Sequence, residues 1–372
     1  MNKIGVAVIG ASPLSPGWAV TAHIPAIRAL PDYELTAVGA SRRESAEAAA
    51  AAFGVPAFDD PEGLLAHPGV DLVVVAVKAP HHRALISAAL DAGKMVLSEW
   101  PLGIDLDEAI DLAARAETVG VRTVIGLQGR FAPAVRHARD LVARGYVGEV
   151  LATTLVGSGI AWAGETDRAH GYMFDAAKGA NVLSVPVSHA LDAVQHVLGE
   201  FASVGATAAV RRPTVRLVED GTLLPVTAFD HAAIGGTLEG GAVASVFYRG
   251  GVSRGQNLRW EINGTEGDLV LSSGVGNLQV ADLVLEGGRG ADTGVRPIAL
   301  PAPYAEEPGG LSGGPGANVL RLYAHLARDI REGTSTVPGF AHAVRRHRLL
   351  AAIEGAAHGG HRRLDHRGRD AG

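Results

Sequence analysis

The chain has 372 residues, of which 47% are hydrophobic and 19% charged, so it can bury a core and is long enough for about two domains. Its formal net charge of −6 excludes the strong positive field that would hold nucleic acid or an anionic membrane surface. The sequence has no cysteine, which excludes disulfides, thiolate metal ligands and a cysteine nucleophile. No apolar run has the length that spans a bilayer, and the first eleven residues resemble a strand more than a signal peptide. We therefore expect a cytoplasmic protein that binds a small molecule or another protein.

Short apolar runs alternate with Ala-rich helical stretches through the first third of the chain, a pattern typical of a doubly wound parallel sheet with helices on both faces. The predicted strands are 4–10, 33–41, 71–77, 94–100 and 121–127. The predicted helices are 18–30, 43–53, 81–92 and 105–119. Gly93 suits a helix C-terminus, and the Asp105 side chain suits an N-cap.

The pattern of predicted elements changes near residue 127. Helices are predicted near 131–144, 182–198 and 318–332, and the segments between them are β-rich and separated by Gly-containing turns, with a loop at 301–317. This pattern favours an α+β domain with a large, mostly antiparallel open sheet. We predict a dinucleotide-binding domain at 1–127, a substrate and oligomerisation domain at 128–356, and a flexible polar tail at 357–372.

The turn after the first strand, GASPLSPGWAVTAH at residues 10–23, is a possible phosphate site. Free backbone N–H groups and the dipole at a helix start face the phosphates of a dinucleotide in such turns, as in Rossmann domains. The strict G-x-G-x-x-G spacing is missing: Gly10 is present, Ser12 takes the second glycine position, and an insertion precedes Gly17 and Trp18. The alternative is a Gly/Pro-rich loop that binds nothing.

The end of the second predicted strand bears on the choice of cofactor. An acidic residue there would hydrogen-bond a ribose 2′-hydroxyl, whereas Ser41, Arg42 and Arg43 suit a 2′-phosphate. The sequence therefore favours NADP over NAD, unless both arginines are merely solvated residues at a helix start.

Five segments together resemble the Gfo/Idh/MocA oxidoreductases, over nearly the whole chain. They are HIPA (23–26), KAPHHRALISAALDAGKMVLSEWP (78–101), GRFAPAVRHARDLVARGYVGEV (129–150), SHALDAVQHVLG (188–199) and INGTEGDLVL (262–271). The resemblance implies an N-terminal Rossmann domain joined to a C-terminal α/β domain with an open antiparallel sheet. It also implies a cofactor cleft lined by Ala79, Pro80, His82, Glu99, Gln128 and Arg130.

Two positions depart from the family pattern. Where relatives carry the lysine of Glu-Lys-Pro, which assists proton transfer beside the nicotinamide and the substrate, this chain has Trp100, and an indole has no acid or base function at neutral pH. The aspartate that normally precedes the family's histidine is Val185 here. His189 remains and could act alone as acid or base, with Asp192 as a further substrate-contacting residue.

These changes, with the lengthened turn and the segments LQGR, YMFD and NVLRLY, are similar to the fungal galactose-pathway repressor branch of the family, whose members bind a dinucleotide but act through protein contacts. Two functions therefore stay open, because fold does not decide between them. The first is an NAD(P)-dependent oxidoreductase of a sugar, polyol or related carbonyl compound, with His189 as acid or base, Tyr172 or Lys178 as helpers, and Asp175 near the substrate.

The second is an inactive dinucleotide-binding sensor, in which Trp100 stacks over the nicotinamide pocket and occupancy is passed to a protein partner. A structural protein with an empty pocket is a third, less favoured interpretation. In each case we expect a homodimer or homotetramer formed through the C-terminal sheet, and no metal, direct nucleic-acid contact or membrane association.

Overall fold

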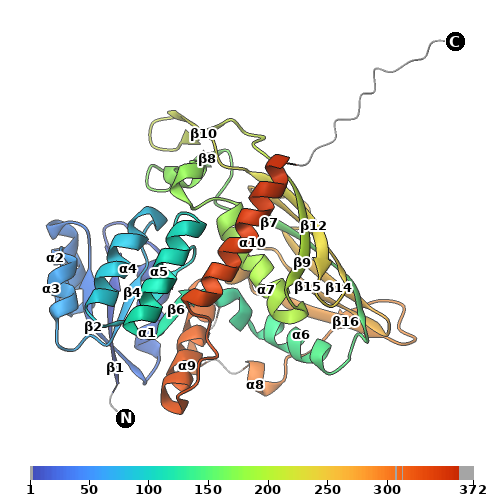
Figure 1. Ribbon diagram of the computed structural model, residues 1–372, viewed down its shortest axis with the longest axis horizontal. Coiled ribbons are helices and arrows are strands. Elements are labelled where there is room, and N and C mark those ends of the chain that lie inside the picture. Colours follow the sequence, from blue (N-terminus) through green and yellow to red (C-terminus); the bar gives the residue numbers. More distant parts are fainter. Residues whose placement is uncertain (1–2, 306–307, 312, 360–372) are drawn as a thin grey trace.

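The computed structural model describes residues 3–305, 308–311 and 313–359, and two sheets organise it (Figure 1). The N-terminal sheet is parallel and six-stranded, in the order β3-β2-β1-β4-β5-β6. Its strands are β1 (Ile4–Ile9), β2 (Tyr33–Gly39), β3 (Ala57–Phe58), β4 (Leu72–Val75), β5 (Met95–Glu99) and β6 (Thr123–Gly126). The order reverses between β1 and β4, so this is the predicted doubly wound sheet, with its ligand crevice expected beyond the carboxyl ends of these two strands.

Helices cover both faces of this sheet, which is why all four residues of β4 are buried. They are α1 (Ile24–Ala29), α2 (Arg43–Phe53), α3 (Pro61–Ala66), α4 (His82–Asp91) and α5 (Leu106–Val119). Asp105 caps α5 as predicted, accepting a hydrogen bond of 2.9 Å from the Glu108 N–H. Gly93 lies just beyond α4 at φ 67°, a conformation that favours glycine. The short elements β3 and α3 were not predicted.

The C-terminal sheet has eight strands in the order β17-β16-β15-β14-β7-β13-β12-β9. They are β7 (Val150–Gly159), β9 (Phe201–Ala209), β12 (His231–Leu238), β13 (Val243–Gly250), β14 (Leu258–Gly264), β15 (Gly267–Ser273), β16 (Val284–Arg289) and β17 (Arg296–Pro297). Neighbours pair antiparallel except β7 with β13, which confirms the predicted mostly antiparallel sheet. A small separate sheet contains β8 (Glu165–Thr166), β10 (Thr214–Leu217) and β11 (Leu223–Pro225).

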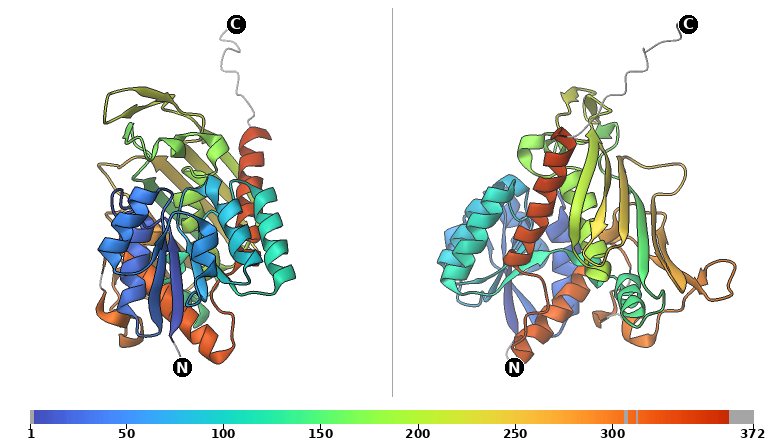
Figure 2. Two further views of the ribbon diagram at one scale, coloured as in Figure 1. Left: turned by 90° about the vertical axis from the view of Figure 1, so that its left-hand side faces the viewer. Right: turned by 45° about the vertical axis from the view of Figure 1, so that its right-hand side comes forward.

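One face of the large sheet packs on helices, and the last two helices join the domains (Figure 2). The remaining helices are α6 (Pro133–Ala143), α7 (Ser188–Leu198), α8 (Ala302–Ala305), α9 (Gly316–Glu332) and α10 (Phe340–Gly359). Residues of α9 such as Leu322 and Tyr323 belong to the N-terminal core, and α10 lies against both α5 and β9. The predicted limits of the two domains stay a prediction. Of the predicted tail, 360–372 lie outside the described residues.

The part of the chain that the structure describes contains no helix that is both long and apolar enough to cross a membrane.

Candidate functional site

Gly10 lies at the carboxyl end of β1, where the crevice is expected. Its φ is 100°, and a Cβ atom added there would lie 2.3 Å from the carbonyl oxygen of Ala76. The Gly10 N–H donates to the carbonyl of Gly39 at 2.9 Å. Only glycine satisfies both the backbone conformation and this close approach. The first glycine of the predicted phosphate turn is therefore required by the fold itself.

The rest of the turn leads into a π-helical turn at Ala19–His23, which continues as α1. Ser12 and Trp18 are half-buried and Gly17 is exposed. The Trp18 Nε1 is buried, and no described residue accepts its hydrogen bond. Since buried donors normally have partners, this orphaned N–H fits a ligand oxygen at the start of the helix. Gly17 has no positive φ, and a Cβ atom added there would have no described neighbour within 4 Å.

The arginines after β2 are exposed at the start of α2, beside Ser41. Arg43 forms an ion pair with Glu47, its Nε lying 3.1 Å from the carboxylate. Arg42 has no such partner among the described residues. Of the two guanidinium groups, the one on Arg42 is therefore available to a ligand phosphate.

The segment after β4 contains Ala79, which is buried, Pro80, which is exposed, and His82. The His82 Nδ1 lies 2.9 Å from the carbonyl oxygen of Pro101, and its Nε2 lies 3.0 Å from that of Val77. Burial lowers the pKa of His82, so the neutral ring donates to one of these carbonyls. The ring connects the segments after β4 and β5. Both of its nitrogens lie next to backbone carbonyls, so His82 positions the strand ends that face the expected cofactor crevice.

Lys78 was not predicted from the sequence, although it lies three residues beyond the end of β4. Its exposed ammonium group lies 4.9 Å from the centre of the Tyr172 ring, a cation–π distance across the two domains. Tyr172 is half-buried, and burial raises the pKa of its hydroxyl. Position alone could have signalled Lys78, since polar residues at the carboxyl ends of parallel strands face the crevice.

Glu99, the last residue of β5, belongs to a hydrogen-bonded chain. The His23 Nε2 donates to Glu99 Oε1 at 3.0 Å, and the His23 Nδ1 accepts from the Tyr323 hydroxyl at 2.9 Å. Gly126 leaves room for this carboxylate, because a Cβ atom there would lie 2.3 Å from Glu99 Oε1. The carboxylate is thus fixed at the sheet edge by α9 and by the turn before α1.

Trp100 is 5% exposed and lies between the domains. Its indole N–H donates to the carbonyl of Ser184, in the π-helical turn Leu183–Val187 that precedes α7. Its ring centre lies 4.6 Å from that of His347 on α10, with the planes inclined at 46°. The position that holds lysine in the resembled family therefore carries no ionisable group here, and it joins β5 to the second domain.

His189 is in the first turn of α7 and is 3% exposed. No described residue bonds its Nδ1. Burial lowers the pKa of His189 to about 4, although the carboxylates of Glu99 and Asp192 oppose this shift. The imidazole is therefore neutral at pH 7 and has an unused ring nitrogen.

Arg130 and Asp192 form a buried ion pair between the segment after β6 and α7. The Arg130 Nε donates to Asp192 Oδ2 at 2.9 Å and its Nη2 donates to Oδ1, while the His342 Nε2 lies 2.8 Å from the same carboxylate. These cationic and polar neighbours hold the pKa of Asp192 well below its usual range, against the effect of burial. Next to Arg130, the buried Gln128 has an Oε1 without a partner among the described residues.

Two predicted residues have other surroundings. Asp175 caps the turn Ala176–Lys178, accepting from the Ala177 N–H at 3.0 Å. Lys178 is exposed, and no contact of its ammonium group occurs in the described part of the chain. The structure therefore places Tyr172, but not these two side chains, in a contact between the domains.

Because His189 is buried, we expect the folded protein to lose stability in acid. The folded pKa of about 4 lies below the ordinary 6.5, so the unfolded chain binds the extra proton between these values. The stabilisation is complete above pH 6.5 and is lost as the pH falls towards 4, by roughly 3 kcal/mol for this group. We expect the free energy of unfolding in urea to fall less steeply with acidification in His189→Gln than in the parent. If the free energy of unfolding falls with pH equally steeply in His189→Gln and in the parent, this prediction is wrong.

A parallel sheet with this strand order, a glycine-dependent turn at its switch point and a histidine between two domains defines a dinucleotide-binding protein of the oxidoreductase type. The pattern of the oxidoreductase family with an NAD-binding Rossmann fold matches residues 4–127, and that of the Gal80p C-terminal domain matches residues 133–273. The chain belongs to the Gfo/Idh/MocA oxidoreductase family, near its Gal80 branch, as its motifs predicted.

Proteins similar to this chain in sequence include the following three. Dehydrogenase aclE of Aspergillus oryzae is 39% identical over 51% of this chain and 53% of its own length. The galactose/lactose metabolism regulatory protein GAL80 of Saccharomyces cerevisiae is 28% identical over 72% and 67%. An uncharacterized oxidoreductase of Synechocystis, sll0816, is 30% identical over 73% and 72%. The match to aclE thus spans about half of that protein.

Solved structures confirm the fold. A super-repressor mutant of Gal80p from Saccharomyces cerevisiae has a TM-score of 0.86 at 24% identity and covers 96% of both chains. Levoglucosan dehydrogenase, in complex with NADH and levoglucosan, has a TM-score of 0.82 at 23% identity, covering 96% of this chain and 98% of the other.

Proposed function

We propose that the protein is an NAD(P)-dependent oxidoreductase of a sugar, polyol or related carbonyl compound, with His189 as its acid and base. The observation that carries this is the state of His189, which is buried, neutral at pH 7 and unbonded at Nδ1, under the influence of Glu99 at the end of β5. A neutral imidazole nitrogen of this kind can take the proton of an alcohol and return it.

The residues at the sheet edge fit a dinucleotide. Gly10 lets the strand ends approach closely, and the orphaned Trp18 N–H and Gln128 Oε1 offer a donor and an acceptor without protein partners in the described residues. Bound NAD(P) supplies the hydride acceptor or donor. The NADH complex of the similar levoglucosan dehydrogenase supports NAD(H) binding at such a sheet.

The chain's own residues then move the proton. The His189 nitrogen accepts it from the substrate hydroxyl, and the carboxylates of Glu99 and Asp192 stabilise the imidazolium that results. Tyr172, with the Lys78 ammonium 4.9 Å from its ring centre, is the best placed helper. Trp100 moves no proton, because its indole N–H is bonded to the carbonyl of Ser184.

The choice of substrate class rests on relatives. Levoglucosan and L-sorbose are named in complexes of the similar levoglucosan dehydrogenase, and aclE is named a dehydrogenase. Sugars and polyols are therefore the first compounds to test.

Turnover and binding separate this function from its alternative. We expect the purified protein to change reduced-nicotinamide absorbance with at least one sugar or polyol, and His189→Ala to lose about 10²–10⁴ of that rate while NADH affinity stays within about twofold. His67→Ala, a histidine beyond α3, is the control and should retain the rate. Tight NADH binding without turnover across the panel, or full activity in His189→Ala, would remove the proposal.

The proposed cofactor preference is NADP, carried by Arg42 and supported by Ser41. Arg42 is exposed and without an ion-pair partner in the described residues, whereas Arg43 is held by Glu47. We expect Arg42→Ala to raise the Kd of NADP about tenfold and that of NAD less than about twofold, since one charge-assisted hydrogen bond is lost. Arg43→Ala is the matched control and should change both by little. Equal losses for the two cofactors in Arg42→Ala would contradict the preference.

A dinucleotide-binding regulator is the second candidate, favoured by the buried indole of Trp100 in the lysine position and by the Gal80p match over residues 133–273. Such a protein would bind NAD(P) tightly, show no turnover and contact a protein partner. In both cases the C-terminal sheet, whose far face carries exposed Leu151, Val243 and Val284, is proposed to form a homodimer or homotetramer. Sedimentation of the purified chain tests this.

A further inference from the structure

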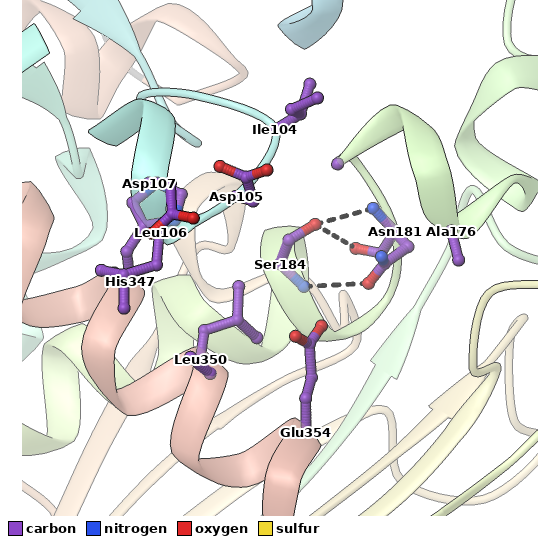
Figure 3. Close-up of a pocket in the computed structure, with 12 residues that line it drawn as sticks. Ile104, Asp105, Leu106, Asp107, Ala176, Asn181, Ser184, His347, Leu350 and Glu354 are labelled. Atoms are coloured by element: carbon purple, nitrogen blue, oxygen red, sulfur yellow. Dashed lines mark hydrogen bonds between the residues drawn. The ribbon is translucent and has the colours of Figure 1, made fainter. Parts of the chain in front are cut away.

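A cavity of about 320 Å³ lies between the domains, lined by residues at the start of α5, before α7 and on α10 (Figure 3). Its wall comes from residues 104–107 at the start of α5, from residues 176–184 and from residues 347–354 of α10. None of the residues assigned above to the cofactor or to proton transfer lines it. This volume lies at the lower end of the range for pockets that bind small organic molecules.

The charge of this wall is negative. Asp105, Asp107 and Glu354 line it, and the described residues of the wall include no lysine or arginine. One oxygen of Asp105 caps α5, but the carboxylates of Asp107 and Glu354 make no ion pair or hydrogen bond with any described residue. Burial raises the pKa of Glu354, although the nearby His358 opposes this shift, and no described lysine or arginine pairs with the carboxylate. A bound cation would supply such a partner.

Buried polar side chains on the same wall give a second, independent indication. His347 is 2% exposed, and its Nε2 has no partner in the described part of the chain. Asn181 is 7% exposed, and its Oδ1 accepts from the N–H groups of Leu183 and Ser184; Figure 3 shows the bond to Ser184. A buried group such as the His347 Nε2 normally has a partner, and a ligand in the cavity would supply one.

The protonation state of His347 bears on the charge of the ligand that the cavity can bind. Burial lowers the pKa of this histidine to about 4, although Asp105 opposes the shift, so at pH 7 its ring does not compete with a cation. A primary ammonium has three donors and suits several separate acceptors better than a planar guanidinium does. The Asn181 amide would donate to a ligand hydroxyl, and Leu350 offers apolar surface to its carbon atoms.

Two residues of the wall are also the contacts of Trp100. The carbonyl of Ser184 accepts the indole N–H, and the His347 ring packs on the indole at 4.6 Å between centres. Trp100 directly follows Glu99 at the end of β5. A ligand that binds Ser184 and His347 therefore acts on a side chain at the edge of the cofactor crevice.

We propose that this cavity binds a small, hydroxylated primary ammonium compound, and that Trp100 transmits its occupancy to the dinucleotide site. By linkage, the ammonium compound and the dinucleotide change each other's affinity by the same factor. The proposal requires that the dinucleotide binds, but it requires no hydride transfer and no substrate, so it can be tested separately from the proposed oxidoreductase activity.

Calorimetric titration of the whole protein with ethanolamine and 1,3-diamino-2-propanol at pH 7.5 tests binding, with glycerol as the uncharged control. We expect saturable binding of the amines only. Binding should be at least about tenfold weaker in Glu354→Gln, as expected for loss of one partly buried charge, and weaker by a smaller factor in Asp107→Asn, because Asp107 is exposed. Glu117→Gln, on the exposed part of α5, should bind as the parent does. Equal affinity in all variants, or no saturable binding in the millimolar range, would overturn the proposal.

Transmission has its own readout. We expect saturating amine to change the Kd of NADH about fivefold, a coupling of common size, and the change to vanish in Trp100→Phe, which keeps the ring but removes the N–H bonded to Ser184. Thermal unfolding of Trp100→Phe checks that it is folded, and Glu117→Gln should show the parental coupling. Amine binding that leaves the Kd of NADH unchanged in the parent would overturn the transmitting role of Trp100.

Discussion

Replacement of Asp192 by alanine is expected to lower the free energy of unfolding by about 3–5 kcal/mol. The Asp192 carboxylate is 1% exposed and receives two hydrogen bonds from the Arg130 guanidinium, with His342 at 2.8 Å. Its removal leaves a guanidinium that is 11% exposed without its counterion, and that uncompensated charge is the main cost. Urea unfolding of the variant measures the loss.

Asp220 offers a matched control, because it also pairs with an arginine, Arg168, but on the surface, where the side chains are 45% and 66% exposed. Asp220→Ala should leave the free energy of unfolding close to that of the parent, because exposed ion pairs contribute little. A similar loss of stability in both variants would show that burial does not increase the cost of breaking the Arg130–Asp192 ion pair. Since Asp192 is one helical turn from His189, turnover should fall in Asp192→Ala as well.

The N-terminal domain was predictable because its strands are buried on both faces. Continuous apolar runs such as those of β1 and β4 leave a strong local signal, and Asp105 and Gly93 mark helix ends through short-range chemistry. The two-residue β3 and the six-residue α3 are too short to leave such a signal.

Helix α10 was not predicted, for a different reason. It packs on α5 on one side and on β9 on another, and its buried residues include Arg346 and His347 as well as Leu350. Buried positions therefore do not form a single apolar stripe along the helix, and periodicity gives no clear indication. The cavity and the ring contact of Trp100 depend on this helix, so neither could be inferred from the sequence.

The sequence gives candidate site residues but not their contacts. Motifs located Glu99, Trp100 and His189, because each follows or begins a recognisable element. Their partners come from distant parts of the chain: Tyr323 closes the chain of bonds to Glu99, and His342 joins the Asp192 carboxylate 150 residues away. Only tertiary structure brings such groups together. It also shows that the indole in the lysine position is bonded to Ser184.

Gly10→Ala is expected to abolish measurable NADH binding and to lower the free energy of unfolding by roughly 2–5 kcal/mol. The new methyl group would lie 2.3 Å from the Ala76 carbonyl oxygen, and alanine would have to adopt a φ of 100°. Relief of this contact requires β1 and β4 to separate at the crevice. NADH fluorescence titration and urea unfolding measure the two effects.

Gly17→Ala is the matched control within the same turn. Gly17 has no positive φ, and no atom lies within 4 Å of its added Cβ, so the substitution should leave the free energy of unfolding unchanged or raise it by about 0.4–1 kcal/mol through the unfolded state. If Gly17→Ala is stable but binds NADH weakly, the cofactor passes close to Gly17 and its predicted role holds; if it binds as the parent does, only Gly10 forms the phosphate turn. Parental stability in Gly10→Ala would contradict the close approach of β1 to β4, on which the proposed cofactor site depends.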